Sequence, residues 1–536
     1  MSTRHFPIAI VGAGPTGLTL ANLLGVYGVA CVVIERNAAT VHEPRAVSID
    51  DESLRTMQAA GLAGEVIAKT VAGYGSHYFS ARGRLFAKVQ PTEQPYGFPR
   101  RNAFRQPILE QQLRAALDRF PHVTALFEHE LLSFEQDDHG VTLRVRGEAG
   151  ESELTCDYLA ACDGASSPVR RTLGIAMSGS TFSERWLIVD LENSPADSPH
   201  TKVFSNPRRP CIALPGPERT RRYEFMLHKD ERDEDMLAPA VVQRLLREHE
   251  AAPESRIVRT VVYTFHARLA ERWRERRVIL AGDAAHLMPP FAGQGMNSGL
   301  RDANNLAWKL AAVTQGHLGA GLLASYQEER RGHAASMIGF ALNMGRVLAP
   351  PNAYAAWAIE TGFRALALFP AARDYVAQMK FKPPPRFERG FIVPDGAPAR
   401  STLVGRLFPQ PHVTAGGIET LLDDVLGPGF AILVRSARPE AALPLLRAAP
   451  WSDLGARIVV FGEGASSAGV TVVRERGEPS LRLARYRDHV ILLRPDRYVA
   501  ACIAVDDLER VAPAVGKLIA ATFESGGRHG TQAAAG

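Results

Sequence analysis

The chain carries no charged residue between Phe6 and Ile34. A membrane helix needs about 20 mostly apolar residues, so the length of this stretch alone would allow one. The stretch is interrupted, however, by Gly12, Gly14, Pro15, Gly17, Gly25 and Gly28. A secretory signal is not favoured either, because Arg4 alone would form its basic start and no clear cleavage site follows. The order instead predicts a strand (IAIVG), a helix (TGLTLANLLGVYG) and a strand (ACVVIE), which together form a buried parallel βαβ unit.

A glycine motif joins the first strand to the helix. Gly12, Gly14 and Gly17 form G-x-G-x-x-G, and Glu35 ends the next strand, 18 residues after Gly17. In this motif the first glycine allows a tight turn, the second lets the backbone approach a pyrophosphate, and the third lets helix and strand pack closely. Free amides at the helix start can bind phosphate oxygens, and Glu35 can accept hydrogen bonds from a ribose. The motif predicts a nucleotide site, with an empty tight turn as the alternative, and it does not distinguish NAD from FAD.

Composition narrows the function further. The chain has 536 residues, of which 46% are hydrophobic and 22% charged, which suggests two to four ordinary globular domains. The net charge of +5 is small, and the two dense basic runs, RRPCIALPGPERTRR and ERWRERR, are typical of solvated surface, so no nucleic-acid partner is expected. The five cysteines are scattered and form no CxxC pair, which favours a reducing compartment without disulfides. We expect a soluble, cytoplasmic protein with no membrane span and no metal site.

Two later motifs favour FAD over NAD. Asp163 and Gly164 follow an apolar strand in YLAACDGASSPVRRTLG. Gly282 and Asp283 follow the strand VILA, and a glycine-rich turn and a helix come next. Either aspartate alone could simply cap a turn. In this order and at this separation, the two motifs together are a much more specific sign of an FAD site than either aspartate alone.

Together the three motifs resemble those of the class A FAD-dependent aromatic hydroxylases, which are flavoprotein monooxygenases. The stretches PRAVSIDDESLRTMQAAGL, PRRNAFRQPILEQQL and LLRPDRYVAA are similar to one subgroup, the 3-(3-hydroxyphenyl)propionate hydroxylases, and the likeness covers nearly the whole chain. The resemblance implies that the first motif holds the ADP half of FAD, the second lies near the flavin, and the third contacts the ribityl chain and diphosphate. The implied cofactor-binding residues are Gly12, Gly14, Pro15, Gly17, Glu35, Arg36, Arg45, Gln106, Asp163, Gly164, Gly282, Asp283, Pro290, Gly293, Gly295, Met296 and Asn297.

The expected fold class is α/β, with a Rossmann-like FAD-binding domain, an inserted mixed-sheet substrate domain and a C-terminal domain that the resemblance makes thioredoxin-like. Because that last domain lacks CxxC, we expect it to serve packing or oligomerisation, for example in a homodimer, rather than redox chemistry. The expected ranges are 1–75, 106–178 and 271–380 for FAD binding, 76–105 and 179–270 for the substrate sheet, and 398–525 for the C-terminal domain. The tail GGRHGTQAAAG is expected to be disordered.

The resemblance also implies the reaction. NADH or NADPH, with NADH favoured, would reduce the flavin, and O2 would form a C4a-hydroperoxyflavin. A phenolic acid, 3-(3-hydroxyphenyl)propionate or 3-hydroxycinnamate, would then be hydroxylated ortho to its hydroxyl to give a catechol. In such enzymes the cofactor performs the hard step, and the protein supplies placement and electrostatics.

Candidate residues for substrate chemistry are fewer. Asp50, in SIDDE, is the candidate base near the phenol; the alternative is that Asp50 or Asp51 caps the following helix, a role that suits Asp51 better. A propionate side chain would need a cationic partner, for which Arg208, Arg209 and Arg222 are candidates.

Other functions stay open at this stage. The enzyme could hydroxylate another phenol or a polyketide, since motifs at the FAD site do not discriminate among substrates. A non-catalytic flavin-binding redox protein would bind FAD without substrate-accelerated reduction, and a plain NAD dehydrogenase would be colourless. A flavin halogenase is disfavoured because it would need a Trp-x-Trp stretch, whereas all five tryptophans are isolated.

Overall fold

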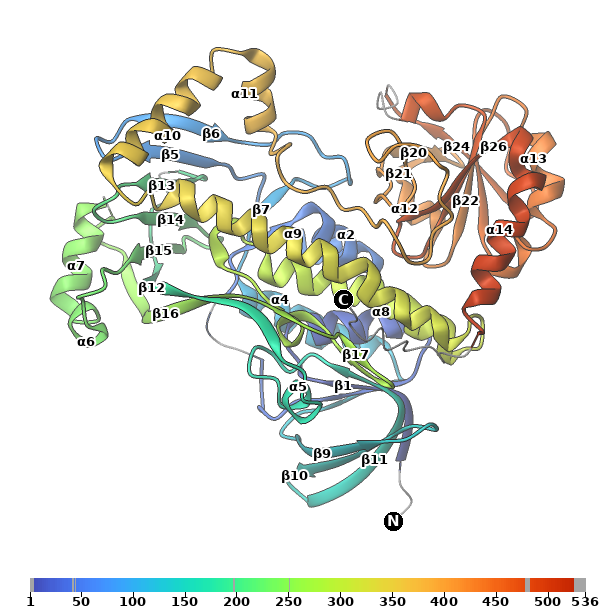
Figure 1. Ribbon diagram of the computed structural model, residues 1–536, viewed down its shortest axis with the longest axis horizontal. Coiled ribbons are helices and arrows are strands. Elements are labelled where there is room, and N and C mark those ends of the chain that lie inside the picture. The colour runs from blue at the N-terminus through green and yellow to red at the C-terminus, as the bar shows by residue number, and fades with distance from the viewer. Residues whose placement is uncertain are drawn as a thin grey trace, which may run out of the picture. The chain divides into compact units, whose positions relative to one another are not determined.

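The computed structural model describes residues 4–40, 43, 45–195, 198–249, 251–477 and 483–524, without the side chains of 182 and 183. The C-terminal tail predicted to be disordered therefore lies outside the described residues. Contacts divide the chain into a first unit (1–26, 30–304 and 332–384) and a second unit (27–29, 305–331 and 385–536). The α/β class is confirmed, with three large mixed sheets (Figure 1).

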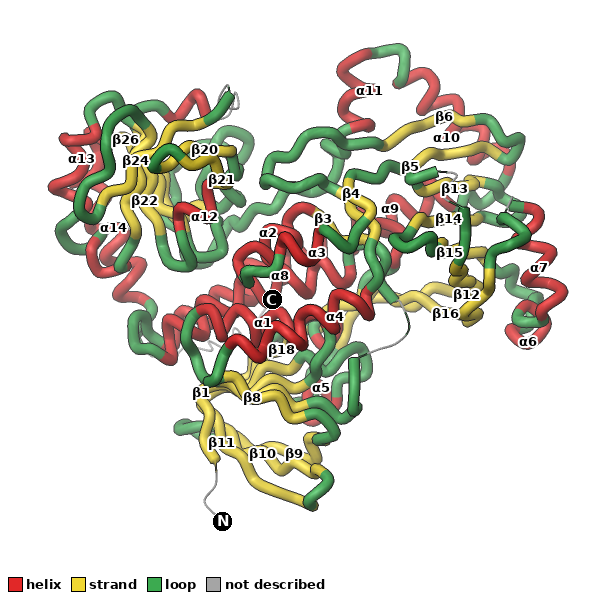
Figure 2. Tube along the Cα trace, turned by 180° about the vertical axis from the view of Figure 1, so that it is seen from behind, coloured by secondary structure: helices red, strands yellow, loops and turns green. Residues whose placement is uncertain are grey.

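The first sheet carries the predicted βαβ unit. Strand β1 runs parallel to both β2 and β11, and β11 runs parallel to β18. Helices α1 and α4 lie side by side against this sheet (Figure 2). The uncharged opening stretch is buried because the sheet and these helices enclose it. The elements are β1 (Arg4–Val11), α1 (Pro15–Val26), β2 (Cys31–Ile34), α4 (Gln106–Ala115), β8 (Val123–Leu126), β9 (Glu130–Gln136), β10 (Val141–Gly147), β11 (Gly150–Ala161), α5 (Pro168–Thr172), β17 (Arg274–Glu275) and β18 (Val278–Leu280).

The second sheet has eight strands in the order β19-β16-β12-β15-β14-β13-β5-β6. Its strands alternate as the sequence predicted: Leu187, Val189, Tyr223 and Phe225 pack in one apolar cluster with residues of α7. The side chains between them point to the opposite face. The elements are β5 (Ser76–Ser80), β6 (Leu85–Val89), β12 (Met177–Glu192), β13 (Thr201–Ser205), β14 (Cys211–Pro215), β15 (Arg221–Met226), α6 (Asp233–Met236), α7 (Pro239–Glu248), β16 (Arg256–Ala270) and β19 (His286–Leu287).

A small sheet and several helices complete the first unit and lead into the second. Strands β3 and β4 both pair with β7. None of the helices in the described ranges is both long and apolar enough to cross a bilayer. The elements are β3 (Ser48–Asp50), α2 (Asp51–Ala59), α3 (Ala63–Ile67), β4 (Val71–Ala72), β7 (Arg101–Ala103), α8 (Gly295–Thr314), α9 (Ala324–Leu348), α10 (Ala353–Leu366) and α11 (Pro370–Ala377).

The second unit contains a seven-stranded mixed sheet in the order β21-β20-β24-β23-β22-β25-β26. Strand β23 pairs in parallel with β22 and β24, whereas β25 is antiparallel to both of its neighbours. The elements are β20 (His412–Ala415), β21 (Ile418–Leu421), α12 (Leu422–Leu426), β22 (Ala431–Arg435), α13 (Pro439–Leu446), β23 (Arg457–Phe461), β24 (Val470–Glu475), β25 (His489–Leu493), β26 (Val499–Ala504) and α14 (Leu508–Ala521).

A fully buried ionic cluster lies inside the second unit. Glu329 accepts hydrogen bonds from Lys309 Nζ at 2.6 Å and from both terminal nitrogens of Arg494 at 2.7 and 2.8 Å. Arg494 also binds Asp496 and lies over the ring of Trp308. Glu329 therefore bridges two buried cations, and Glu329 and Asp496 together balance their charge.

All five cysteines are free thiols, four of them buried. Burial raises the pKa of Cys31, Cys156 and Cys502 to about 12. Burial also raises the pKa of Cys162 and Cys211 far above the ordinary value.

Candidate active site

The turn between β1 and α1 forms one side of the site. Gly12 has φ +101°, and a Cβ there would collide with the carbonyl oxygen of Cys162. A Cβ on Gly17 would collide with the carbonyl oxygen of Gly12, so helix and strand touch at this point. A Cβ on Gly14, in contrast, would meet nothing within 4 Å. The backbone is therefore tightly packed at Gly12 and Gly17 and accessible at Gly14, as a phosphate-binding turn requires.

Glu35 is fixed against the same turn. Its carboxylate accepts the backbone N–H groups of Ala13 and Asn37, each at 2.9 Å. Pro15 and Gly14 line the adjoining cavity. Arg36 is exposed and is absent from the cavity wall.

The two aspartate motifs follow neighbouring parallel strands, so both lie at the same edge of the first sheet. Asp163 accepts the N–H of Val169 with one oxygen, and its other, buried oxygen has no partner among the described residues. Burial raises the pKa of Asp163 and of Asp283. Gly164 and Gly282 have φ +82° and +61°, which glycine adopts readily.

The glycine-rich turn before α8, the β1–α1 turn and the two aspartate motifs together form what we call the dinucleotide cradle. Gly293 has φ +62°, and Pro290, Gly295 and Met296 line the cavity with it at the start of the helix. Asn297 is buried and does not line the cavity. It donates to the carbonyl oxygens of Ser48 and Gly293 at 3.0 and 2.6 Å, and thus ties this turn to β3.

These segments surround a cavity of about 400 Å³, within the range of small-molecule sites. Arg45 and Gln106 also line it, and Gln106 Oε1 accepts the N–H of Ala46 at 2.7 Å. The second sheet supplies a mostly apolar wall that includes Ile188, Ile212 and Phe265. The open turn at Gly14 and the two helix starts line this cavity and fit a dinucleotide such as FAD, with an apolar chamber beside it.

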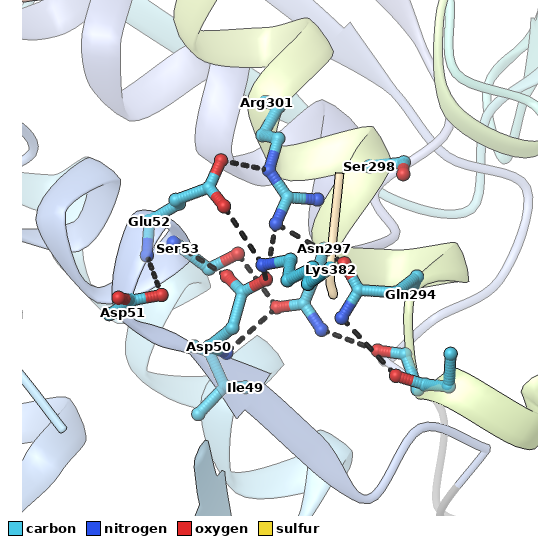
Figure 3. Close-up of polar contacts among 12 residues, drawn as sticks. Ile49, Asp50, Asp51, Glu52, Ser53, Gln294, Asn297, Ser298, Arg301 and Lys382 are labelled. Carbon is cyan, nitrogen blue, oxygen red and sulfur yellow. Dashed lines mark hydrogen bonds and ion pairs between the residues drawn. The ribbon is translucent and has the colours of Figure 1, made fainter. Parts of the chain in front are cut away.

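Asp50 belongs to a separate ionic cluster (Figure 3). It caps α2 by accepting the N–H of Ser53 at 3.0 Å, so the expectation that the cap suits Asp51 better is wrong: the helix begins one residue earlier. Its other oxygen binds Arg301 and, at 3.0 Å, Lys382. Glu52 pairs with the same two cations. Asp50 is not among the residues that line the cavity.

The three consecutive acids of this cluster ionise differently. Burial alone would raise the pKa of Asp50 and Glu52, but Arg301 and Lys382 lower both below their usual range. Asp51, which is turned away from Arg301 in Figure 3, has its pKa raised to about 7 by burial, and the charges of Asp50 and Glu52 add to this. Of the three acids, Asp51 is therefore the one whose pKa is raised toward neutral pH.

We expect Asp51→Asn to stabilise the protein at pH 8 by on the order of 2 kcal/mol. The folded-state pKa lies above the unfolded value of 3.8, so the wild type loses stability as pH rises from about 4 through 7. The amide avoids this loss and can still accept the Glu52 N–H. Melting temperatures of Asp51→Asn and wild type at pH 4 and pH 8 check this expectation, because the stabilisation should be absent at pH 4. Asp50→Asn should instead lower stability by weakening the pairing of Arg301. An equal gain in melting temperature for Asp51→Asn at both pH values would contradict the raised pKa of Asp51.

The three arginines expected to bind a substrate carboxylate are not brought together. Arg208 is exposed, and Arg209 pairs with Glu231 at 2.5 Å; neither lines the cavity. Arg222 does line it, but its guanidinium binds Asp190 at 2.7 Å and the carbonyl oxygen of Arg45 at 2.7 Å.

Several polar cavity residues were not predicted from the sequence, among them Arg101 and Glu224. Arg101 donates to Ser76 Oγ at 2.5 Å and to Tyr74 Oη at 3.0 Å, and no acid among the described residues pairs with it. Glu224 is buried in the wall formed by the second sheet. The alternation of RRYEFMLH placed Glu224 and Arg222 on one face, which was the available signal. No local sequence pattern indicated Arg101. The same holds for Arg301 and Lys382, which lie outside the cavity.

Comparison with known proteins assigns the family. The family model described as FAD binding domain matches residues 5–341, well over half of the chain. The chain belongs to the FAD-binding monooxygenase family. A second family model, the HcaD C-terminal domain, matches residues 405–518.

Curated members of this monooxygenase family include close relatives. The 3-(3-hydroxy-phenyl)propionate/3-hydroxycinnamic acid hydroxylase of Mycobacterium sp. (strain JLS) is 41% identical over 93% of this chain and 89% of the relative. Hydroxylase 2 of the same name from Burkholderia vietnamiensis (strain G4 / LMG 22486) is 42% identical over 92% of this chain and 93% of the relative. The chain is thus a flavoprotein aromatic monooxygenase, as predicted.

Solved structures agree on the fold. The flavin-dependent monooxygenase PieE, in complex with FAD and substrate, has a TM-score of 0.80 at 24% identity and covers 96% of this chain and 99% of its own. Aklavinone-11 hydroxylase, in a ternary complex with FAD and aklavinone, has a TM-score of 0.76 at 26% identity and covers 97% of this chain and 100% of its own.

Proposed function

We propose that this monooxygenase converts 3-(3-hydroxyphenyl)propionate or 3-hydroxycinnamate to the corresponding catechol, using O2 and NADH or NADPH, with NADH favoured. The observation that carries the proposal is the 41–42% identity over more than nine-tenths of the chain to hydroxylases named for these substrates. The cavity supports it, because an apolar chamber adjoins the dinucleotide cradle.

The residues of the cradle would each perform a physical task. The amides at the start of α1, with Gly14, would bind the diphosphate, and Glu35 the adenosine ribose. Asp163 and Asp283 would contact the flavin side of the cofactor, and the amides at Gly295 and Met296 would stabilise negative charge on its pyrimidine edge. Bound FAD would supply hydride acceptance and O2 activation. The apolar wall would exclude water from the reacting centre.

Arg101 replaces the earlier candidates as the proposed partner of the substrate's side-chain carboxylate. It lines the cavity, and its hydrogen bonds to Ser76 and Tyr74 hold the guanidinium without neutralising it. Arg222 is already neutralised by Asp190. A planar guanidinium suits a carboxylate because it can donate two parallel hydrogen bonds.

The test is turnover of the purified, FAD-loaded protein with a panel of phenols. Hydroxyphenylpropionate should stimulate NADH oxidation, and the product mass should increase by one oxygen atom. Stimulation by another phenol or a polyketide alone would change the substrate assignment. Bound FAD without any substrate-stimulated oxidation would indicate a non-catalytic flavin protein.

In the same assay, Arg101→Met should raise the KM for hydroxyphenylpropionate by about 10- to 100-fold, since a hydrogen bond to a charged group contributes about 1.5–3 kcal/mol. The KM for 3-ethylphenol, which has no carboxylate, should change little. Arg208→Met is the matched control, because Arg208 is exposed and outside the cavity. An equal change for both substrates would remove Arg101 from this role.

We also propose the division into domains given by the sequence. Residues 1–75, 106–178 and 271–380 would bind FAD, and residues 76–105 and 179–270 would hold the substrate. Residues 398–525 would form a thioredoxin-like domain for packing or oligomerisation, which the mass of the protein in solution tests.

A further inference from the structure

Glu224 lies on β15, in the interior of the eight-stranded sheet (Figure 1). Its neighbours Tyr223 and Phe225 pack in the apolar cluster that includes residues of α7, so alternation directs Glu224 to the opposite face. That face lines the cavity, and only 4% of Glu224 is exposed. A carboxyl group is therefore held inside the chamber proposed for the aromatic ring.

The residues in register with Glu224 across the sheet are apolar, whereas Arg222, Asp190 and Arg259 lie on the same face further along the strands. Its register partners are Ile188 on β12 and Ile212 on β14. One strand further, Ile212 pairs with Val203, and Val203 pairs with Tyr78. All of these side chains line the cavity. An ionisable group within such a row needs a polar partner, which the cavity's occupant can supply.

The protein itself leaves Glu224 without a full set of partners. Its one ionic contact among the described residues is Arg222 Nη1 at 4.0 Å, and it accepts no hydrogen bond from them. Arg222 is committed to Asp190, which Arg259 also approaches at 3.6 Å. Burial raises the pKa of Glu224 to about 6; Arg222 opposes this, and Asp190 adds to it. The Cys211 thiol of β14, which pairs with Phe225 on the opposite face, stays protonated because burial raises its pKa.

We propose that Glu224 is the catalytic base that takes the proton of the substrate's phenolic hydroxyl. The inference rests on the proposed function, which requires a phenol in this cavity. In this step the phenolic O–H bond breaks, a new O–H bond forms on the Glu224 carboxylate, and the electron pair stays on the phenolic oxygen. The charge gained by the ring makes its ortho carbon a better nucleophile toward the transferred oxygen. A base whose pKa lies just below neutral pH is well matched to this task.

Glu224 and Arg101 reach the cavity from different strands. Arg101 lies on β7 and binds Ser76 on β5, and β5 is separated from β15 by β13 and β14 in the sheet. A substrate with a polar group at each end can therefore present its carboxylate to Arg101 and its phenolic hydroxyl to Glu224.

The test is Glu224→Gln in the FAD-loaded enzyme, assayed for catechol formation across pH 5 to 9. Wild-type kcat/KM should fall as pH drops through about 6, the region in which Glu224 becomes protonated. The variant should lack this fall and be slower by about 10²- to 10⁴-fold, the usual contribution of a general base. Its deficit should shrink with a ring-fluorinated substrate, whose hydroxyl is more acidic and needs the base less.

The controls separate this proposal from its alternatives. Substrate affinity, followed by the change in flavin absorption, should differ by less than about fivefold between Glu224→Gln and wild type if the side chain acts on the proton rather than on folding. Glu231→Gln, which removes an arginine partner outside the cavity, should keep the wild-type pH profile. An unchanged pH profile in Glu224→Gln, or the same deficit for acidic and ordinary phenols, would overturn the proposal. If the wild type itself converts no phenol, the proposed function fails instead.

Discussion

Replacing Glu329 by alanine should destabilise the second unit by about 3–5 kcal/mol. The change leaves Lys309 and Arg494 buried with too little opposing charge, because Glu329 is the carboxylate that bridges them. Asp496 still pairs with Arg494, but no other acid among the described residues forms an ion pair with Lys309. The loss is large because an unpaired buried charge cannot be hydrated.

Thermal melting and limited proteolysis of the full chain check this expectation, since cleavage should increase within the second unit. Glu463→Ala is the matched control: Glu463 also pairs with an arginine, Arg474, but both side chains are exposed. An exposed pair contributes about 0–1 kcal/mol, so that variant should melt like the wild type. Similar behaviour of the two variants would show that the buried cluster carries no special stability.

The pH dependence of the wild type follows from the same cluster. Burial alone would raise the pKa of Glu329, but Arg494 and Lys309 lower it to about 2. Because the folded pKa lies below the unfolded value of 4.5, the stabilisation is complete above about pH 4.5 and is lost as pH falls toward 2.

The second large effect concerns Gly14→Val, which we expect to weaken FAD binding by at least about 100-fold while leaving the apoprotein equally stable. A side chain on Gly14 has free space around it, so folding should tolerate it. That same space is where the diphosphate would approach the backbone, and the added methyl groups would exclude it. Flavin absorption of the purified protein and titration with FAD measure the affinity.

Two glycine variants serve as controls for this expectation. Gly64→Ala also places a Cβ in open space, but within α3, and should retain FAD. Gly17→Ala should lower both stability and FAD content, because its Cβ meets the Gly12 carbonyl oxygen. Full retention of FAD by Gly14→Val would contradict the placement of the diphosphate at this turn.

Local sequence patterns predicted the βαβ unit and the strands of the second sheet well. The glycine spacing and the acid at Glu35 predicted the turn because each residue there acts on near neighbours, as in the hydrogen bond from Ala13 to Glu35. Period-two alternation likewise marked β12 and β15.

The contents of the cavity were harder to predict, because they depend on register across strands far apart in the chain. Arg208 and Arg209 fall between β13 and β14 rather than on the cavity face, whereas Arg222 faces the cavity. Asp50 receives its partners from Arg301 and Lys382, which lie 251 and 332 residues away. No local pattern encodes such pairings, so the acid's role could not be inferred from its neighbours alone.

The state of the five thiols has a consequence for oxidative damage. A flavin hydroxylase that meets a poor substrate releases hydrogen peroxide, and peroxide attacks thiolates far faster than protonated thiols. With every cysteine held as the neutral thiol, and four of the five shielded from solvent, the protein offers peroxide almost no reactive cysteine. Prolonged futile turnover should therefore oxidise few of its thiols, even without an external reducing agent.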